Sequence, residues 1–342
     1  MCCSSVVGEI VDTRPMIVPL HPGYSFAGSE AIRRCVNLDL EITYPIQRGL
    51  ITDWNKMERL WQHAFHNELR AVPEEHPILL ADTPLNPSAV REKTTEIMFE
   101  IFNAPALYLA NQAMLVLYSS GRSTGVVLDS GDGITYSASL YEGHILPHSV
   151  QRLELAGRDL TNRFREFLIS KGYMAQKDLV FDTAEDLKHN WGFITLGLDR
   201  ESTEIKYKLP DGQLLALGNE RSAIPEALFQ PHLIGVEGKG MHELVFDSVR
   251  RVDPDLRRDL YGNIILAGGS TMFPATAARI VNGIANLAPS SMKVKVVAPP
   301  ERKHSCWIGG SILASMDTFR NIRCSKQEYH EAGSQIIHRK FF

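Results

Sequence analysis

The sequence lacks the features that mark a membrane protein or a nucleic-acid-binding protein. No apolar run reaches the roughly 18 residues that a membrane-spanning helix needs. The formal net charge is only −4, from 36 basic and 40 acidic side chains, and the basic residues form no long block. We therefore expect no binding of nucleic acid and no association with a membrane.

Cysteine is scarce, and its spacing does not indicate a metal site. The N-terminus also lacks the basic region and long apolar stretch of a secretion signal. A reduced intracellular compartment is the simpler interpretation. The five cysteines, none in a paired metal-binding spacing, are Cys2, Cys3, Cys35, Cys306 and Cys324.

The 342 residues suffice for one large or two medium domains, and their 44% hydrophobic content is that of an ordinary globular protein. Apolar residues at helical spacing predict a helix over 54–69, with Asp53 as its N-cap. A second helix is predicted to begin at Asn86 (N-cap) and Pro87 (first turn). The short apolar run 77–80 between them predicts a buried strand. This alternation of helix and strand indicates an α/β fold.

The turn 129–133 lies between an apolar run, 125–128, and an alternating run, 134–140. This order predicts a β-hairpin whose tip is bare backbone. Glycine at Gly131 and Gly133 lets backbone N–H groups approach a phosphate, and aspartates at the bend can orient waters around a cation. Aspartate and glycine are also common in plain structural turns, so that alternative stays open.

A second glycine turn follows the predicted buried strand 263–267. Gly268 and Gly269 come directly after it, at the carboxyl end where open α/β sheets bind nucleotides. Met272 and Phe273 offer an apolar surface for a base, although the glycines could serve close packing alone. Two such turns together suggest two lobes that meet over one ligand. A helix is predicted to open at Pro274, and a strand is predicted over 294–297.

Short segments spread over most of the chain from about residue 40, and in a fixed order, resemble the actin and actin-related protein family. Their number and order make a chance match untenable. The segments are 54–87, 128–133, 155–161, 209–213, 218–221, 225–231, 299–303, 307–314 and 325–329.

The resemblance implies an α/β, actin-like ATPase fold of the ribonuclease H-like type, with two related lobes around a nucleotide cleft. It also implies four subdomains. These are a subdomain 2-like loop region over 1–44, a subdomain 1-like part over 45–119 and 305–342, a subdomain 3-like part over 120–155 and 237–304, and a subdomain 4-like part over 156–236.

The resemblance further implies ATP or ADP as a ligand, with Mg²⁺ or Ca²⁺. By position, Asp129 would hold the cation through water, and Gln112 would place the attacking water. Without the resemblance, Lys188 and Lys303 would be interpreted as solvated surface lysines. The residues that would contact the nucleotide are Gly131, Asp132, Gly133, Gly157, Lys188, Gly268, Gly269, Ser270, Met272, Phe273 and Lys303.

Several positions depart from the family pattern. The segment 5–8 resembles the stretch just after the family's first phosphate-loop hairpin, which predicts a first lobe truncated at its N-terminus. Tyr136 stands where the family has a histidine near the attacking water, and a phenol is a poor base near neutral pH. His189 replaces a glutamate expected near the sugar, and Arg48 replaces another histidine. Weakened or absent nucleotide binding is therefore expected.

The leading hypothesis is a divergent actin-like structural protein of the cytoplasm and cytoskeleton, with the nucleus as a second location. Its expected partners are actin, further copies of itself, or actin-binding proteins, and its enzymatic activity is at most that of a slow ATPase. The alternatives are a polymerising, ATP-hydrolysing actin, a non-nucleotide-binding subunit of a larger complex, a small-molecule kinase, and a poorly folded gene product. No separate carboxylate base supports the kinase.

Three regions are expected to contact partners, with simple packing as the alternative for each. The loop 15–26 resembles the subunit-contacting loop of the family. The segment 229–244 resembles the region that bridges filament strands. Tyr118, Gly143 and His144 lie near the family's partner-binding groove.

Overall fold

The computed structural model describes residues 5–10, 25–28, 31, 40–173, 177–196, 204–209 and 212–341. The chain divides into two compact units. The first unit contains Met1–Ala110 and Asp317–Phe342, and the second contains Asn111–Met316. Each unit is described by itself below. The division into four subdomains stays a prediction.

The first unit contains a small antiparallel sheet with strand order β2-β1-β3. Its register places Val7 opposite both Ala27 and Thr43, and Val7 is fully buried. A short hairpin, β4–β5, follows along the chain. The strands are β1 (Val7–Ile10), β2 (Ser25–Ala27), β3 (Leu40–Thr43), β4 (Ile46–Gln47) and β5 (Leu50–Ile51).

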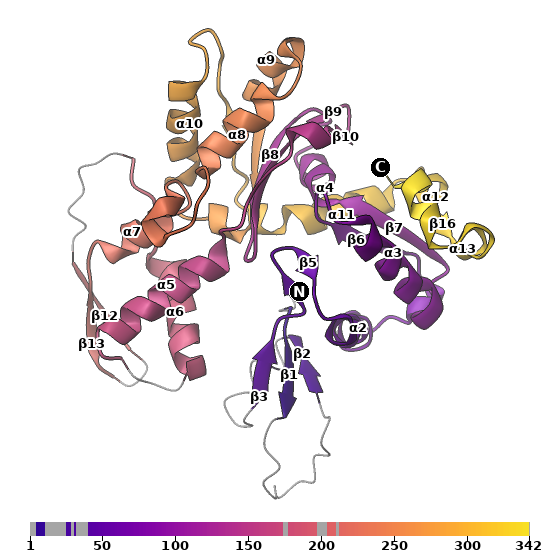
Figure 1. The fold of residues 1–342 in the computed structure, drawn as a ribbon, viewed down its shortest axis with the longest axis horizontal. Coiled ribbons are helices and arrows are strands. Elements are labelled where there is room, and N and C mark those ends of the chain that lie inside the picture. Colours follow the sequence, from indigo (N-terminus) through magenta and orange to yellow (C-terminus); the bar gives the residue numbers. More distant parts are fainter. Residues whose placement is uncertain are drawn as a thin grey trace, which may run out of the picture. The chain divides into compact units, whose positions relative to one another are not determined.

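A second sheet of the first unit, of order β16-β7-β6, joins distant parts of the chain (Figure 1). Cys324 pairs with Leu107 across this sheet, and the Phe99 and Tyr329 rings stack 4.6 Å apart in the same core. The elements are β6 (Ile78–Asp82), β7 (Ala106–Asn111), β16 (Cys324–Ser325), α2 (Trp54–His63), α3 (Ser88–Glu96), α12 (Phe319–Ile322), α13 (Lys326–Ala332) and α14 (Ile337–Lys340).

The predicted start of α2 is confirmed, because the Asp53 side chain accepts a hydrogen bond from the Lys56 amide at 3.0 Å. The predicted cap of the next helix is wrong by one residue. Helix α3 begins at Ser88 with Pro87 at the N-cap position. The Asn86 side chain instead donates to Asp82 Oδ1 at 2.6 Å.

The second unit is built on a sheet of order β10-β9-β8-β14-β15, with β11 also paired to β9. The predicted hairpin is confirmed as antiparallel strands β8 and β9. Strand β14 lies parallel to β8 on its other side, and β15 lies parallel to β14. The strands are β8 (Gly125–Ser130), β9 (Thr135–Tyr141), β10 (His144–Ile145), β11 (Gln151–Leu153), β14 (Ile264–Ala267) and β15 (Val296–Val297).

Helices cover both faces of this sheet, which explains why β8 is apolar at consecutive positions. Val126 and Leu128 face one core, whereas Val127 faces another. On the second face, Gly309 lies so close to helix α4 that an added Cβ would be 1.8 Å from the Leu115 carbonyl oxygen. The helices are α4 (Gln112–Ser119), α8 (Met241–Arg250), α9 (Pro254–Gly262), α10 (Thr276–Leu287) and α11 (Ser305–Ser315).

A further layer of the second unit packs two helices against a two-stranded sheet (Figure 1). Helix α5 ends just before Gly172, whose φ of +82° is accessible to glycine. The elements are α5 (Gly157–Ser170), α6 (Lys177–Trp191), α7 (Glu220–Glu226), β12 (Ile205–Lys208) and β13 (Leu214–Leu217).

Two predicted boundaries of the second unit are corrected. Helix α10 begins at Thr276 rather than at Pro274, and strand β15 covers only the last two residues of the predicted 294–297. Most of the predicted partner loop 15–26 lies outside the described residues. Within the described ranges, none of the helices has the length and apolar character required to cross a bilayer.

Candidate functional site

The turn between β8 and β9 is held from within and from a neighbouring loop. The Gly131 amide donates to the Ile134 carbonyl oxygen at 3.1 Å, which closes the turn. Below it, the hydroxyls of Ser130 and Thr135 are hydrogen-bonded at 2.7 Å, and Thr135 donates to the Leu155 carbonyl at 2.7 Å. The hairpin tip is therefore fixed by buried polar contacts rather than by the turn residues alone.

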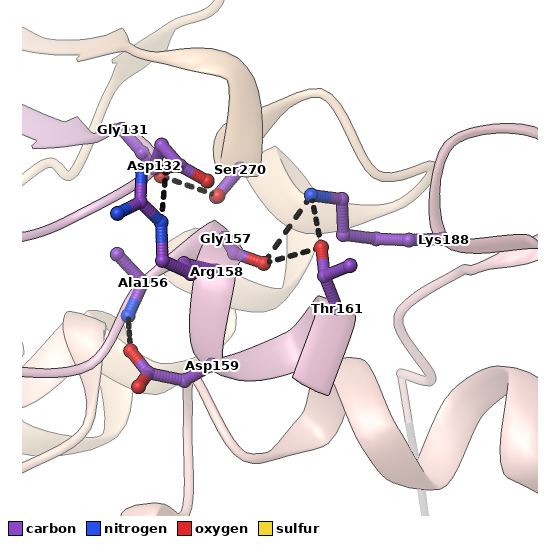
Figure 2. A network of polar contacts seen from close by, with 9 residues as sticks. All are labelled: Gly131, Asp132, Ala156, Gly157, Arg158, Asp159, Thr161, Lys188 and Ser270. Carbon is purple, nitrogen blue, oxygen red and sulfur yellow. Dashed lines mark hydrogen bonds and ion pairs between the residues drawn. The ribbon is translucent and has the colours of Figure 1, made fainter. Parts of the chain in front are cut away.

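The N-terminus of helix α5 lies directly against this turn (Figure 2). The Gly157 and Arg158 amides donate to the carbonyl oxygens of Gly131 and Asp132, at 3.1 and 2.8 Å. A Cβ at Gly157 would be 2.8 Å from Ser270 Oγ and 3.1 Å from the Gly131 oxygen. Gly157 is thus needed for close approach, since any side chain would push the helix away from the turn.

The second glycine turn reaches the same place because β14 runs parallel to β8. Ala267 pairs with Asp129, so Gly268 follows beside Ser130. Gly268 has φ +85° and ψ 152°, a conformation that is almost restricted to glycine. Ser270 Oγ then donates to the Gly131 carbonyl at 2.7 Å. The two turns proposed from sequence are therefore joined by a direct hydrogen bond.

Lys188, on α6, is the most informative charged group of this cluster. It is only 5% exposed, and its Nζ donates to the Gly157 carbonyl at 3.2 Å and to Thr161 Oγ1 at 2.7 Å. No carboxylate in the described ranges lies within ion-pair distance of Nζ. Burial lowers the pKa of Lys188, the carboxylates of Glu185 and Asp132 oppose this effect from a distance, and Arg158 and Lys303 lower the pKa further. A buried ammonium group of this kind has a strong preference for an anion.

Arg158 and Asp132 form an ion pair at the edge of the cluster (Figure 2). Arg158 Nε and Nη2 lie 2.9 and 2.5 Å from Asp132 Oδ2. The Asp132 side chain is 53% exposed, so this pair contributes little stability. One residue on, Asp159 accepts from the Ala156 amide at 2.9 Å and caps helix α5.

Asp129 and Tyr136 are direct partners across the β8–β9 ladder. The Tyr136 hydroxyl donates to Asp129 Oδ2 at 3.2 Å. Burial raises the pKa of Asp129 to about 6, against the effect of the phenol, and raises the pKa of Tyr136 well above its usual value. Burial and the Asp129 carboxyl also raise the pKa of the nearby Cys306 thiol to about 12. Tyr136 is thus a hydrogen-bond donor near neutral pH and not a base.

The remaining predicted residues occupy varied places. Phe273 is 7% exposed and lies against Gly192, where a Cβ would be 2.6 Å from the ring, whereas Met272 is 40% exposed. Gly269 has open space at its Cβ position. Gln112 is the first residue of α4, and its role stays a prediction.

Sequence reasoning missed two contacts of the cluster. Thr161 and the ion pair of Arg158 were not predicted, although both residues stand within a matched segment. His189 adjoins Lys188, and burial, Lys188 and Lys303 lower its pKa. It is therefore neutral near pH 7, in the same electrostatic neighbourhood as the two lysines.

Comparison with known families agrees with this architecture. The family model described as Actin matches the chain in two overlapping stretches, residues 1–189 and 176–342. The matched stretches together include every element of both units. The chain therefore belongs to the actin family and has its α/β, two-lobe ATPase fold.

Proposed function

We propose that this chain is a structural, partner-binding member of the actin family that retains a weakened nucleotide site within residues 111–316. Members of this family usually bind a nucleotide with a divalent cation. The observation that carries the proposal is Lys188, a buried ammonium group with two neutral hydrogen-bond partners and, in the described ranges, no carboxylate within ion-pair distance. A phosphate group would provide the missing negative charge.

The residues around Lys188 fit a phosphate. The two turns are rich in glycine, and Gly157 and Gly268 could not carry a Cβ without close contacts. Such bare backbone lets a tetrahedral anion approach the chain. Met272 lies on the same segment as Gly268 and is 40% exposed, so it offers an apolar surface for a base. These features together favour a nucleotide over free phosphate.

Hydrolysis by this site would be slow. The Tyr136 phenol donates to Asp129 and has a raised pKa, so it does not accept a proton from water near neutral pH. Gln112 would only orient the water. Phosphate release from ATP by the purified protein measures this directly, and a rate equal to that of conventional actin would contradict a slow site.

Nucleotide binding is tested by calorimetry with ATP and ADP on the purified full chain. Replacement of Lys188 by glutamine should weaken binding by about tenfold or more, because a charge-assisted hydrogen bond to the phosphate is lost. Lys206→Gln, on an exposed position of β12, is the matched control and should bind as the wild type does. A wild-type protein that is folded but shows no saturable binding would refute the nucleotide site.

Partner binding is tested by sedimentation with actin filaments and with the chain alone. We propose actin, further copies of this chain, or actin-binding proteins as partners, in the cytoplasm and cytoskeleton. Cosedimentation that saturates with filament concentration supports actin as the partner, and concentration-dependent pelleting without actin supports self-assembly. If the chain stays in the supernatant in both cases, it neither binds actin filaments nor assembles with itself under those conditions.

A further inference from the structure

The carboxylate of Asp129 is already engaged within the protein. Its Oδ2 accepts the Tyr136 hydroxyl at 3.2 Å. Its Oδ1 lies so close to Gly268 that an added Cβ there would be 2.4 Å away. The Tyr136 hydrogen bond thus occupies one oxygen and the Gly268 backbone crowds the other, which leaves this carboxylate less open to the water shell of a cation.

The neighbours of Asp129 do not supply other ligands for a hard cation. Cys306 offers a soft sulfur atom, which a hard cation disfavours, and the Tyr136 hydroxyl donates its hydrogen to Asp129. Across the described ranges, no group of three or more histidine, cysteine, aspartate or glutamate side chains could hold a metal ion. Mg²⁺ and Ca²⁺ prefer carboxylate and carbonyl oxygens. The side chains that lie against Asp129 thus fit a divalent cation poorly.

Positive charge comes from lysine side chains instead. Lys188 and Lys303 interact electrostatically with each other and with His189, which shows that they lie in one neighbourhood. Arg158, its ion-pair partner Asp132, and Glu185 also lie within electrostatic range of Lys188. Two ammonium groups can offset much of the charge on a nucleotide's phosphates without a bound metal.

We infer that this chain binds its nucleotide free of divalent cation, with Lys188 and Lys303 supplying the positive charge that a cation supplies elsewhere in the family. The inference rests on the proposed nucleotide site. It departs from the family's usual requirement because the Asp129 carboxylate is held by Tyr136.

The test compares ATP binding by the wild-type full chain in excess Mg²⁺ and in excess EDTA. The two dissociation constants should agree within about threefold, because the cation contributes little. A loss of about tenfold or more in EDTA would overturn the inference while leaving the nucleotide site intact. Absence of binding in both buffers would refute the nucleotide site itself, and the inference with it.

A variant pair isolates the role of the phenol. Tyr136→Phe removes only the hydroxyl, frees Asp129 Oδ2, and should make ATP binding tighter in Mg²⁺ than in EDTA by about tenfold. The matched control is Tyr207→Phe, because Tyr207 also donates to an aspartate, Asp186 Oδ2, at 2.8 Å. That variant should bind equally in both buffers. If Tyr136→Phe shows no gain with Mg²⁺, the phenol does not govern cation use and the inference is wrong.

A lysine variant tests the replacement charge. Lys303→Gln should weaken ATP binding to a similar extent in Mg²⁺ and in EDTA, because the lost charge acts on the phosphates directly. Circular dichroism should show the wild-type fold. Unchanged affinity in both buffers would remove Lys303 from the proposed charge pair and contradict the inference.

Discussion

Two charged clusters of the molecule differ in the hydrogen-bond partners of their lysines. In the second unit, Lys188 is buried with neutral partners only. In the first unit, Lys340 donates to Glu328 Oε1 at 2.5 Å and to the Arg323 carbonyl at 3.1 Å. Glu328 in turn caps helix α13 through Ser325. A cluster that serves stability pairs its charges, whereas a cluster that leaves a buried charge unpaired indicates a ligand.

The largest expected difference between the two regions is at their glycines. Gly268 and Gly333 both have backbone conformations almost restricted to glycine, with φ +85° and φ +69°. Gly333→Ala should cost about 1–3 kcal/mol in strain. Gly268→Ala should cost about 1–3 kcal/mol more, since its Cβ would be 2.2 Å from the Ser130 carbonyl oxygen. Chemical denaturation of both variants measures this. Equal losses in the free energy of unfolding would mean that the backbone around Gly268 shifts to accommodate the added Cβ at no further cost.

Replacement of these two lysines should change the free energy of unfolding in opposite directions. Lys188→Met removes a buried unpaired charge, so the free energy of unfolding without ligand should stay the same or rise by up to about 1 kcal/mol. Lys340→Met should lower it by about 0.5–1 kcal/mol, since the Lys340–Glu328 pair is only partly exposed. Thermal melts without and with nucleotide measure both effects. The contrast fails if Lys188→Met destabilises the free protein as much as Lys340→Met does.

The carboxyl groups of Glu328 and Asp129 should make the stability of their two regions depend on pH in opposite directions. The Lys340 hydrogen bond and the Ser325 amide lower the pKa of Glu328 from 4.5 to about 2. Its contribution to stability is therefore complete above about pH 4.5 and is lost as the pH falls toward 2. Burial raises the pKa of Asp129 from 3.8 to about 6. Its contribution is complete below about pH 3.8 and is lost as the pH rises through 6.

The measurement is the melting temperature of each neutral variant across this range. Glu328→Gln should differ most from wild type above pH 4.5, and the difference should shrink toward pH 2. Asp129→Asn should match wild type near pH 4 and become relatively more stable above pH 6. A variant whose difference from wild type does not change with pH would refute the corresponding shift.

The smallest effect is expected at the two described cysteines, one in each region. Burial raises the pKa of Cys306 to about 12 and that of Cys324 to about 11. Both thiols should therefore react slowly with a thiol reagent at pH 8 in the folded protein and quickly after unfolding. A variant with Cys2, Cys3 and Cys35 replaced by serine restricts the measured reaction to Cys306 and Cys324. Fast reaction of Cys306 alone would show that the Asp129 neighbourhood is open to solvent.

Local features of the fold could be predicted from sequence because their causes are local. Asp53 and the Ser325–Glu328 pair cap helices through contacts over three residues. The hairpin of β8 and β9 follows from an apolar run, a glycine turn and an alternating run. Asn86 was wrong as a cap because its side chain meets Asp82, at the end of the preceding strand.

The contacts of the site depend on packing that the sequence does not show. In the sequence, Lys188 resembles a surface lysine. In the structure it is buried because α6 packs against α5. The Arg158–Asp132 pair spans 26 residues and exists only because α5 begins at the hairpin tip. By contrast, the pairing of Asp129 with Tyr136 follows from the hairpin register and could have been derived once the turn was placed.

The first unit is assembled from two ends of the chain, since residues 317–342 join residues 1–110. Arg91 donates to the Phe341 carbonyl at 3.0 Å, and Leu107 pairs with Cys324. During synthesis the continuous middle portion can fold as soon as it leaves the ribosome. The N-terminal portion must wait, with apolar surface uncovered, until residues 317–342 have been synthesised. The interval between synthesis of these two segments therefore sets how long the apolar surface of the first unit stays exposed to aggregation.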